Sequence, residues 1–191
     1  GAPIFMEKAV SHSLDGCRSV QTAARGAADG QCIFMGFNLR HLTPLAEAKA
    51  VIASGQIGKV LFINYVECLR FAHGAGYFSR FHRDTGESGG MLVTKSCHDF
   101  DMMSWLAGSR PGRVLAVQDR LYFGLGGPDT RERCQTCDHA EGCDFDRLKK
   151  LPDRKARREY ERIFIGPSKL SQDDYCPDIC VWRADTDLAD L

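Results

Sequence analysis

Two short segments of the sequence carry side chains that could bind or move protons. Glu7 and Lys8 follow residues 4–6, an apolar Ile-Phe-Met run that predicts the end of a buried strand. A lysine at the carboxyl end of such a strand lies where open α/β sheets bind ligands. Its ammonium could polarise a carbonyl group or hydrogen-bond a hydroxyl. A surface Glu-Lys pair is the alternative explanation of the same two residues.

The second segment leads into an apolar helical pattern. A helix that begins near Ser96 places Lys95 and His98 near its first turn, with Asp101 three residues after His98 on the same face. A histidine beside a carboxylate can act as a general acid or base near neutral pH. Lys95 would lower the imidazole pKa and could bind a substrate hydroxyl. The alternative is an ordinary helix start, with Ser96 as the cap and His98 facing the core.

Cysteine is concentrated in the last third of the chain. Nine cysteines are present, an odd number, so they cannot all pair with one another within the chain. Thiolates at the C-x2-C spacing can hold one tetrahedral ion, which two further ligands would complete as a closed structural site. Free or disulfide-linked cysteines in a long loop are the alternative. The residues predicted to bind structural zinc are Cys134, Cys137, Cys143 and Cys180, and Cys176 and His139 are further candidates in the same region.

Composition excludes several classes of protein. A chain of 191 residues with 43% hydrophobic and 26% charged residues predicts one globular domain or slightly more. Lys and Arg number 25, as do Asp and Glu, so the net charge is zero. This balance gives no electrostatic footprint for nucleic acid or an anionic membrane. No run is long enough to span a bilayer and no signal-peptide pattern occurs, so we expect a soluble, cytoplasmic protein.

Caps and apolar spacing predict the elements that position these residues. Ser11 or Ser13 would cap the first helix, and Thr43 followed by Pro44 would begin the second. Gly108 would end the third. We expect helices near 13–28, 43–55 and 96–107, strands near 31–37, 59–70 and 114–123, a loop over 71–90 and a charged helix near 147–162.

The order and spacing of several motifs resemble the Gfo/Idh/MocA family of NAD(P)-dependent oxidoreductases, over about residues 4–123. The motifs are Glu-Lys-Ala at 7–9, Gly-Phe-Asn-Leu-Arg at 36–40, Ile-Ala-Ser-Gly-Gln-Ile-Gly at 52–58, Gly-Gly at 89–90, His-Asp-Phe-Asp at 98–101 and Trp-Leu at 105–106. The cysteine loop is similar to one subgroup of the family, in which a lysine precedes the histidine by three residues, as Lys95 precedes His98.

The resemblance implies an α+β fold: the family's C-terminal domain, a largely antiparallel open sheet with helices on one face, preceded by a remnant of a Rossmann domain. Residues 1–30 would be that remnant, and residues 31–191 an incomplete substrate-binding and oligomerisation domain with a cysteine-rich insertion at about 128–181. The chain would be a central to C-terminal piece of the enzyme, inactive alone. The family assembles into dimers or tetramers, so a homodimer or homotetramer is expected.

The resemblance also implies an activity, the transfer of hydride between NAD or NADP and a hydroxyl or keto group of a sugar, inositol or related polyol. Lys8 would lie at the nicotinamide and the substrate, His98 would be the general acid/base, and Lys95 would bind substrate or relay a proton. The residues expected to bind the cofactor are Glu7, Lys8, Asn38 and Arg40.

The sequence departs from the family pattern at three points. Ala9 replaces a proline that often forms a cis bond, Thr94 replaces an aspartate four residues before the histidine, and the chain contains no GxGxxG turn for a pyrophosphate. Two alternatives therefore stand beside the dehydrogenase. One is a non-catalytic ligand-binding or scaffold protein of the same fold with a metal-stabilised loop. The other is a zinc-binding interaction module.

Overall fold

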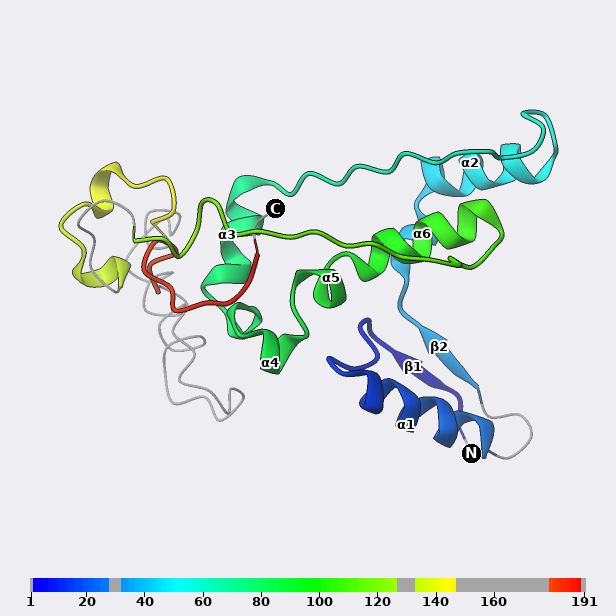
Figure 1. Cartoon of the computed structure of the whole chain (residues 1–191), viewed down its shortest axis with the longest axis horizontal. Coiled ribbons are helices and arrows are strands. Elements are labelled where there is room, and N and C mark those ends of the chain that lie inside the picture. The colour runs from blue at the N-terminus through cyan, green and yellow to red at the C-terminus, as the bar shows by residue number, and fades with distance from the viewer. Residues whose placement is uncertain (1, 28–31, 127–132, 147–178, 190–191) are drawn as a thin grey trace. The chain divides into compact units, whose positions relative to one another are not determined.

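The structure, a computed structural model, is divided into two compact units (Figure 1). The described residues are 2–27, 32–126, 133–146 and 179–189. The first unit contains Gly1–Cys68 and Met91–Ala116, and the second contains Leu69–Gly90 and Val117–Leu191. The charged helix expected near 147–162 lies outside the described residues. Within the described ranges, no helix is both long and apolar enough to cross a membrane.

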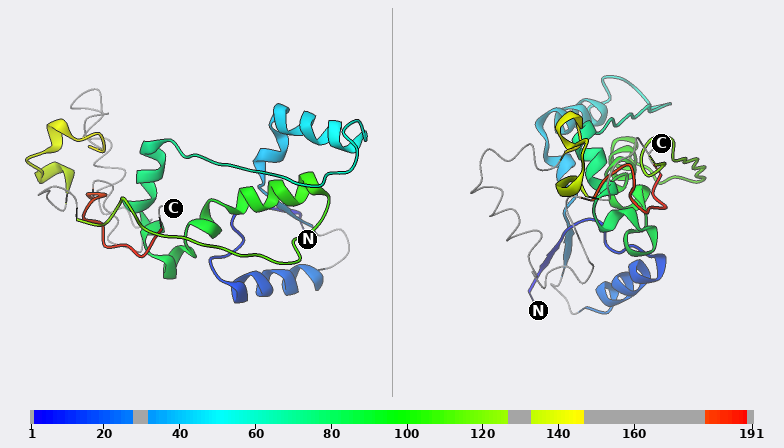
Figure 2. Two further views of the ribbon diagram at one scale, coloured as in Figure 1. Left: turned by 45° about the horizontal axis from the view of Figure 1, so that its top comes forward. Right: turned by 90° about the vertical axis from the view of Figure 1, so that its left-hand side faces the viewer.

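The first unit opens with two parallel strands joined by a helix. Strand β1 (Ile4–Met6) pairs with β2 (Ile33–Met35), and helix α1 (Leu14–Arg25) lies between them in the sequence (Figures 1 and 2). Such a crossover is what a parallel pair requires. The sequence predicts both strands and the helix, and the structure confirms them. The expectation that residues 4–6 are buried is wrong, because this sheet has two strands and Phe5 is 70% exposed.

Helix α1 begins at the second of the two serines proposed as its cap. Ser13 Oγ accepts a hydrogen bond from the backbone N–H of Gly16 at 3.1 Å. This bond satisfies one of the free N–H groups of the first turn. Asp15 in the first turn and Arg25 in the last turn complement the helix dipole.

The next helix, α2 (Thr43–Ala53), follows the short 3-10 helix η1 (Asn38–His41). It begins one residue earlier than the sequence predicts, because Leu42 rather than Thr43 is the N-cap residue. Pro44 lies in the first turn, where its missing N–H group has no consequence. The chain turns away after the helix at Gly55, which has a φ of 78° that favours glycine.

Helices α5 (Met91–Thr94) and α6 (Cys97–Ala107) complete the first unit. The structure confirms the predicted helix start at Ser96, the N-cap residue, and the stop at Gly108, which has a φ of 63°. Lys49 of α2 contacts the other end of α6, where its Nζ donates to the carbonyl oxygen of Trp105 at 2.6 Å. A lysine at this end also complements the helix dipole.

The predicted antiparallel open sheet does not form among the described residues. Residues 59–70 and 114–123 belong to no strand, and the described sheet is the parallel pair of β1 and β2. Strands need partners for their backbone N–H and C=O groups. The apolar side chains of both segments are open as well, since Leu61 is 87% and Leu115 is 91% exposed. These segments are rich in residues that favour strands, but they do not pair as strands.

The second unit is made of short helices and an aromatic core. The loop predicted over residues 71–90 is wrong, because Phe71, Ala75 and Phe78 recur at helical spacing and form one face of a helix. Two glycines in this helix weaken the propensity signal. The described elements of the unit are α3 (Phe71–Phe78), η2 (Phe81–Arg83), α4 (Thr85–Ser88), η3 (Cys134–Thr136) and η4 (Ala140–Gly142).

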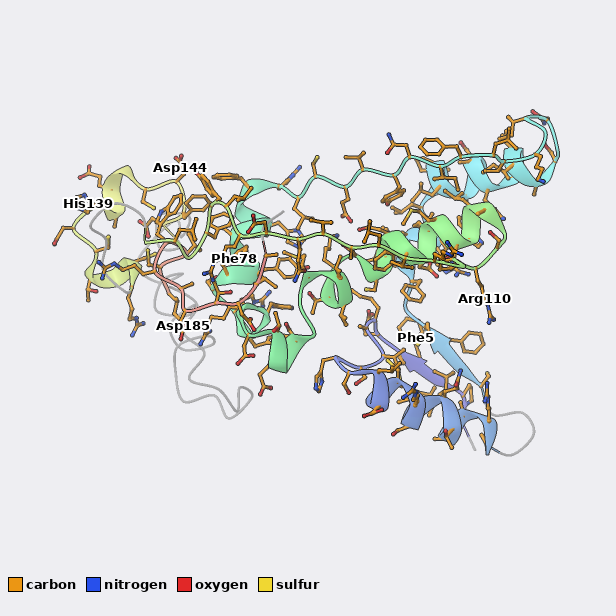
Figure 3. All side chains as sticks on the ribbon, viewed as in Figure 1. Phe5, Phe78, Arg110, His139, Asp144 and Asp185 are labelled. Carbon is orange, nitrogen blue, oxygen red and sulfur yellow. The ribbon has the colours of Figure 1, made fainter. Side chains whose placement is uncertain are left out.

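Aromatic rings fill the centre of this unit. Phe78, which is labelled in Figure 3, is 1% exposed. Its ring centroid lies 4.7 Å from that of Phe123. Phe145 packs against Phe71 at 4.6 Å and against Trp182 at 5.3 Å. Offset and edge-on contacts of this kind add to the stabilisation that burial of the rings provides.

Candidate active site

Lys8 is the second residue after β1, and its side chain reaches the segment before α6. Its Nζ donates a hydrogen bond to the backbone carbonyl oxygen of Thr94 at 2.6 Å. This bond joins the two segments that the sequence analysis selects for their chemistry. The peptide bond between Lys8 and Ala9 is cis.

Glu7 lies at the carboxyl ends of the two parallel strands, against Gly36. A Cβ atom at position 36 would lie 3.0 Å from Oε2 of Glu7 and 3.3 Å from the carbonyl oxygen of Met6. The backbone N–H of Gly36 donates to that same carbonyl at 2.7 Å, which extends the parallel pairing past β2. Glycine at position 36 therefore provides the space in which the Glu7 carboxylate lies.

His98 is in the first turn of α6 and is 8% exposed. Its ring meets the ring of Phe37 edge-on, with centroids 6.1 Å apart. Nδ1 of this histidine is buried and has no hydrogen-bond partner among the described residues. Because nearly all buried polar atoms have a partner, this nitrogen is available to a substrate or to water.

The surroundings of His98 favour its neutral form. Burial is the largest cause of a lowered imidazole pKa, and the ammonium groups of Lys8 and Lys95 lower it further. The carboxylates of Glu67 and Asp101 act in the opposite direction. Together these effects lower the pKa of His98 below its ordinary value, so the ring is neutral at neutral pH and able to accept a proton.

Lys95 is held by a carboxylate that sequence reasoning missed. Its Nζ lies 2.6 Å from Oε1 of Glu67, and both side chains are largely removed from water, with 17% and 25% exposure. Glu67 follows residues 60–66, which are largely apolar, just as Glu7 and Lys8 follow the apolar residues 4–6. That pattern is the signal that could have identified it.

Asn38 and Arg40 lie in η1, which contacts α6 through an ion pair. The Arg40 guanidinium binds both carboxylate oxygens of Asp101, with Nε 2.8 Å from Oδ2. Trp105 lies under the same guanidinium, 5.7 Å from its centre to the ring centroid. The backbone N–H of Asn38 donates to the carbonyl of Gly36 at 2.9 Å. Arg40 is thus fixed on the face of α6 that carries His98 and Asp101.

The predicted zinc site is not supported. Among the described residues, no group of three or more His, Cys, Asp or Glu side chains is gathered to hold a metal ion. The bridge between Arg133 and Ile179 brings the two described cysteine-bearing segments side by side. Sequence spacing therefore did not produce a closed ligand set at Cys134, Cys137, Cys143 and Cys180. The further cysteine, at position 176, lies outside the described residues.

A family comparison assigns the chain. The GFO/IDH/MocA C-terminal domain matches residues 45–141, which is half of the chain. The chain therefore belongs to the Gfo/Idh/MocA family, as the motif order predicts, and this match includes Glu67, Lys95 and His98.

Individual relatives are oxidoreductases by name. The chain is 29% identical over 173 residues to "Putative oxidoreductase YteT" of Bacillus subtilis (strain 168), which covers 87% of the chain and 40% of that protein. It is 27% identical over 121 residues to a 1-carboxy-3-chloro-3,4-dihydroxycyclo hexa-1,5-diene dehydrogenase of Comamonas testosteroni, covering 63% of the chain and 29% of that protein. The chain thus spans less than half the length of these relatives.

A solved structure shows a weaker likeness. The crystal structure described as "a putative myo-inositol dehydrogenase from Sinorhizobium meliloti 1021" is similar over 63% of this chain and 34% of that chain, with a TM-score of 0.48 and 23% identity. A similarity at this level supports no conclusion about activity or substrate.

Proposed function

We propose that this chain supplies the acid/base and substrate-binding groups of an NAD(P)-dependent dehydrogenase that acts on a hydroxyl or keto group of a sugar, inositol or related polyol. The proposal rests most on the hydrogen bond from Lys8 Nζ to the backbone of Thr94. This bond holds the Lys8 ammonium near the buried His98, in addition to the ammonium of Lys95. The name of the Comamonas relative, a dehydrogenase of a dihydroxylated ring, supports a substrate with neighbouring ring hydroxyls.

The residues of this chain fit only the reacting end of a nicotinamide dinucleotide. An ammonium beside an unpartnered buried imidazole suits the polar groups around a transferring hydride. The sequence has no GxGxxG turn to receive the pyrophosphate. When bound, the cofactor would accept or supply the hydride. Glu7, Lys8, Asn38 and Arg40 remain our candidates for contact with it.

Different side chains of this chain transfer the proton and bind the substrate. Neutral His98 accepts the proton of the substrate hydroxyl through its free ring nitrogen as the alcohol is oxidised, and returns it in the opposite direction. The Lys8 and Lys95 ammonium groups hydrogen-bond the same substrate and stabilise negative charge on its oxygen. They also keep the imidazole pKa low, so the base is unprotonated when substrate arrives.

A turnover assay tests this function. The full-length protein that contains this chain is incubated with NAD or NADP and a panel of sugars, inositols and other cyclic polyols, and reduction of the nicotinamide is followed by absorbance. We expect reduction with at least one ring polyol and none with simple primary alcohols of similar size. Absence of nicotinamide reduction across the panel, with bound polyol detected by calorimetry, would contradict the proposal.

That second outcome would favour a non-catalytic ligand-binding protein of the same fold. One observation supports this alternative: position 94, four residues before His98, carries a threonine where a carboxylate is usual in the family. The backbone rather than a side chain of Thr94 engages Lys8. Replacement Thr94→Asp separates the two functions, because it would raise turnover of an enzyme and leave a pure binder inactive.

On the family resemblance we also propose the domain division at about residue 30, with the cysteine-rich insertion at 128–181. Assembly as a homodimer or homotetramer and a cytoplasmic location stay predictions. Gel filtration with light scattering would give the assembly state directly.

A further inference from the structure

Glu67 and Asp99 bring two carboxyl groups together beside Lys95. Glu67 Oε1 receives the Lys95 ammonium at 2.6 Å, and the Glu67 carboxylate is also hydrogen-bonded to Asp99. Oδ1 of Asp99 is buried without a partner among the described residues, and the Asp99 side chain is hydrogen-bonded to Glu67 and Ser96. Two carboxyl oxygens can share a hydrogen bond only when a proton lies between them.

The electrostatics agree with a shared proton. Burial is the main cause that raises the pKa of Asp99, and the neighbouring Glu67 raises it further, to about 6. Burial acts to raise the pKa of Glu67 as well, but its hydrogen bonds to Asp99 and Lys95 outweigh this and lower it overall. The proton therefore belongs mainly to Asp99, which donates it to the Glu67 carboxylate.

We propose that Glu67 and Asp99 form a proton-sharing pair that fixes the Lys95 ammonium beside His98, which makes Glu67 a positioning residue of the site. The inference rests on the proposed function for its catalytic meaning, though the pair itself is independent of it. Glu67 contributes through Lys95 and is assigned no contact with substrate.

The pair links the charge of the site to pH. Below about pH 6 the two carboxyl groups and Lys95 sum to zero, and above it Asp99 ionises and adds one negative charge. The groups that face the pair are Lys95 and His98, together with Tyr65, whose pKa is raised by its burial and by the two carboxylates. The extra negative charge makes the imidazole a stronger base as the pH rises.

A carboxyl titration tests the pair without any turnover. The protein is labelled with 13C at its carboxyl groups, and Asp99 is followed by NMR in the wild type, in Glu67→Gln and in the control Glu47→Gln, which removes an exposed carboxylate of α2. We expect a wild-type midpoint near 6, a midpoint lower by about one pH unit or more in Glu67→Gln, and no change in the control. A wild-type midpoint near 4, or no change in Glu67→Gln, would overturn the pair.

The positioning role is tested by kinetics in the full-length protein that contains this chain. Glu67→Gln should lower kcat roughly tenfold or more, and Glu67→Asp should restore part of it, because the shorter carboxylate keeps the ion pair. In a Lys95→Met background the effect of Glu67→Gln should nearly vanish. If Glu67→Gln lowers kcat as much in the Lys95→Met background as in the wild type, Glu67 does not act through Lys95. If Asp99 titrates as expected but the protein turns over no polyol, the pair is supported and the proposed function is rejected.

Discussion

The Lys8 ammonium donates to the backbone carbonyl of Thr94 at 2.6 Å, which ties the end of β1 to the segment before α6. Because the acceptor is a backbone oxygen, the side chain at position 94 is not needed to hold Lys8. The structure therefore explains how a chain with threonine at this position still brings Lys8 toward His98. Charge at the site then comes from Lys8, Lys95 and the carboxylates around them.

Replacement of Lys8 by methionine should raise the pKa of His98, because one of the two ammonium groups that lower it is removed. We expect the His98 ring to titrate at a higher pH in Lys8→Met, measured by 15N NMR of the imidazole. Lys59→Met, which removes an exposed lysine, serves as the control. An unchanged His98 midpoint in Lys8→Met would show that the two groups do not interact.

The Arg40–Asp101 pair should contribute to stability. The Asp101 side chain is 8% exposed and loses both of its guanidinium contacts in Arg40→Met. Since Arg40 itself is 40% exposed, we expect a loss of about 1–3 kcal/mol in the free energy of unfolding, measured by urea denaturation.

The double variant Arg40→Met with Asp101→Leu should recover part of that loss, because no carboxylate is then left buried and unpaired. Losses that simply add in the double variant would mean that the two side chains act independently.

Asp99 should make stability fall as the pH rises. Its pKa is about 6 in the folded protein against an ordinary 3.8, so the folded state binds the proton more tightly. The resulting stabilisation is complete below the ordinary pKa and is lost as the pH rises through the folded value. Asp99→Asn removes this dependence.

The free energy of unfolding of Asp99→Asn, relative to wild type, should therefore be larger at about pH 7.5 than at about pH 4. Denaturant unfolding at the two pH values measures it. His98 titrates in both proteins, so its contribution cancels from the comparison to first order. A constant difference between the two proteins at both pH values would contradict the assigned pKa.

Two glycines of the second unit offer a matched comparison. Gly124 and Gly126 both have a φ of 71°, and their N–H groups donate to Val181 and Trp182. A Cβ atom at 124 would lie 2.7 Å from Cγ2 of Thr186, whereas one at 126 meets nothing within 4 Å. Gly126→Ala should cost only the backbone strain, about 1–2 kcal/mol, and Gly124→Ala should cost more. Equal thermal unfolding midpoints for the two variants would contradict the packing at Gly124.

Local signals predicted the helices around the site, but they also predicted strands whose formation depends on pairing partners. Helix α6 was predictable because its N-cap at Ser96 and its left-handed stop at Gly108 are encoded within the helix itself. Residues 59–70 have strand composition, but pairing requires another segment at the right distance, and composition carries no such information.

In the candidate site, too, the sequence indicated residues by type and motif but not the contacts between distant segments. Lys8, Lys95 and His98 were identified from residue type and motif order, and the bond to Thr94 could not be foreseen because it joins residues 86 positions apart. Glu67 was missed for that reason too, since its importance comes from Lys95 rather than from its neighbours in sequence. The cysteine spacing, in contrast, predicted a metal site that the described residues do not form.

The most direct test compares wild type with His98→Gln, both in the full-length protein that contains this chain, for nicotinamide reduction by a ring polyol. Glutamine keeps a polar side chain of similar size at the buried position but cannot serve as a base. We predict a fall in kcat of roughly 10²-fold or more, with substrate binding retained, and a wild-type rate that rises with pH with its midpoint below the ordinary histidine pKa. Equal rates in the two proteins would contradict the assignment of His98 as the acid/base on which the proposed function depends.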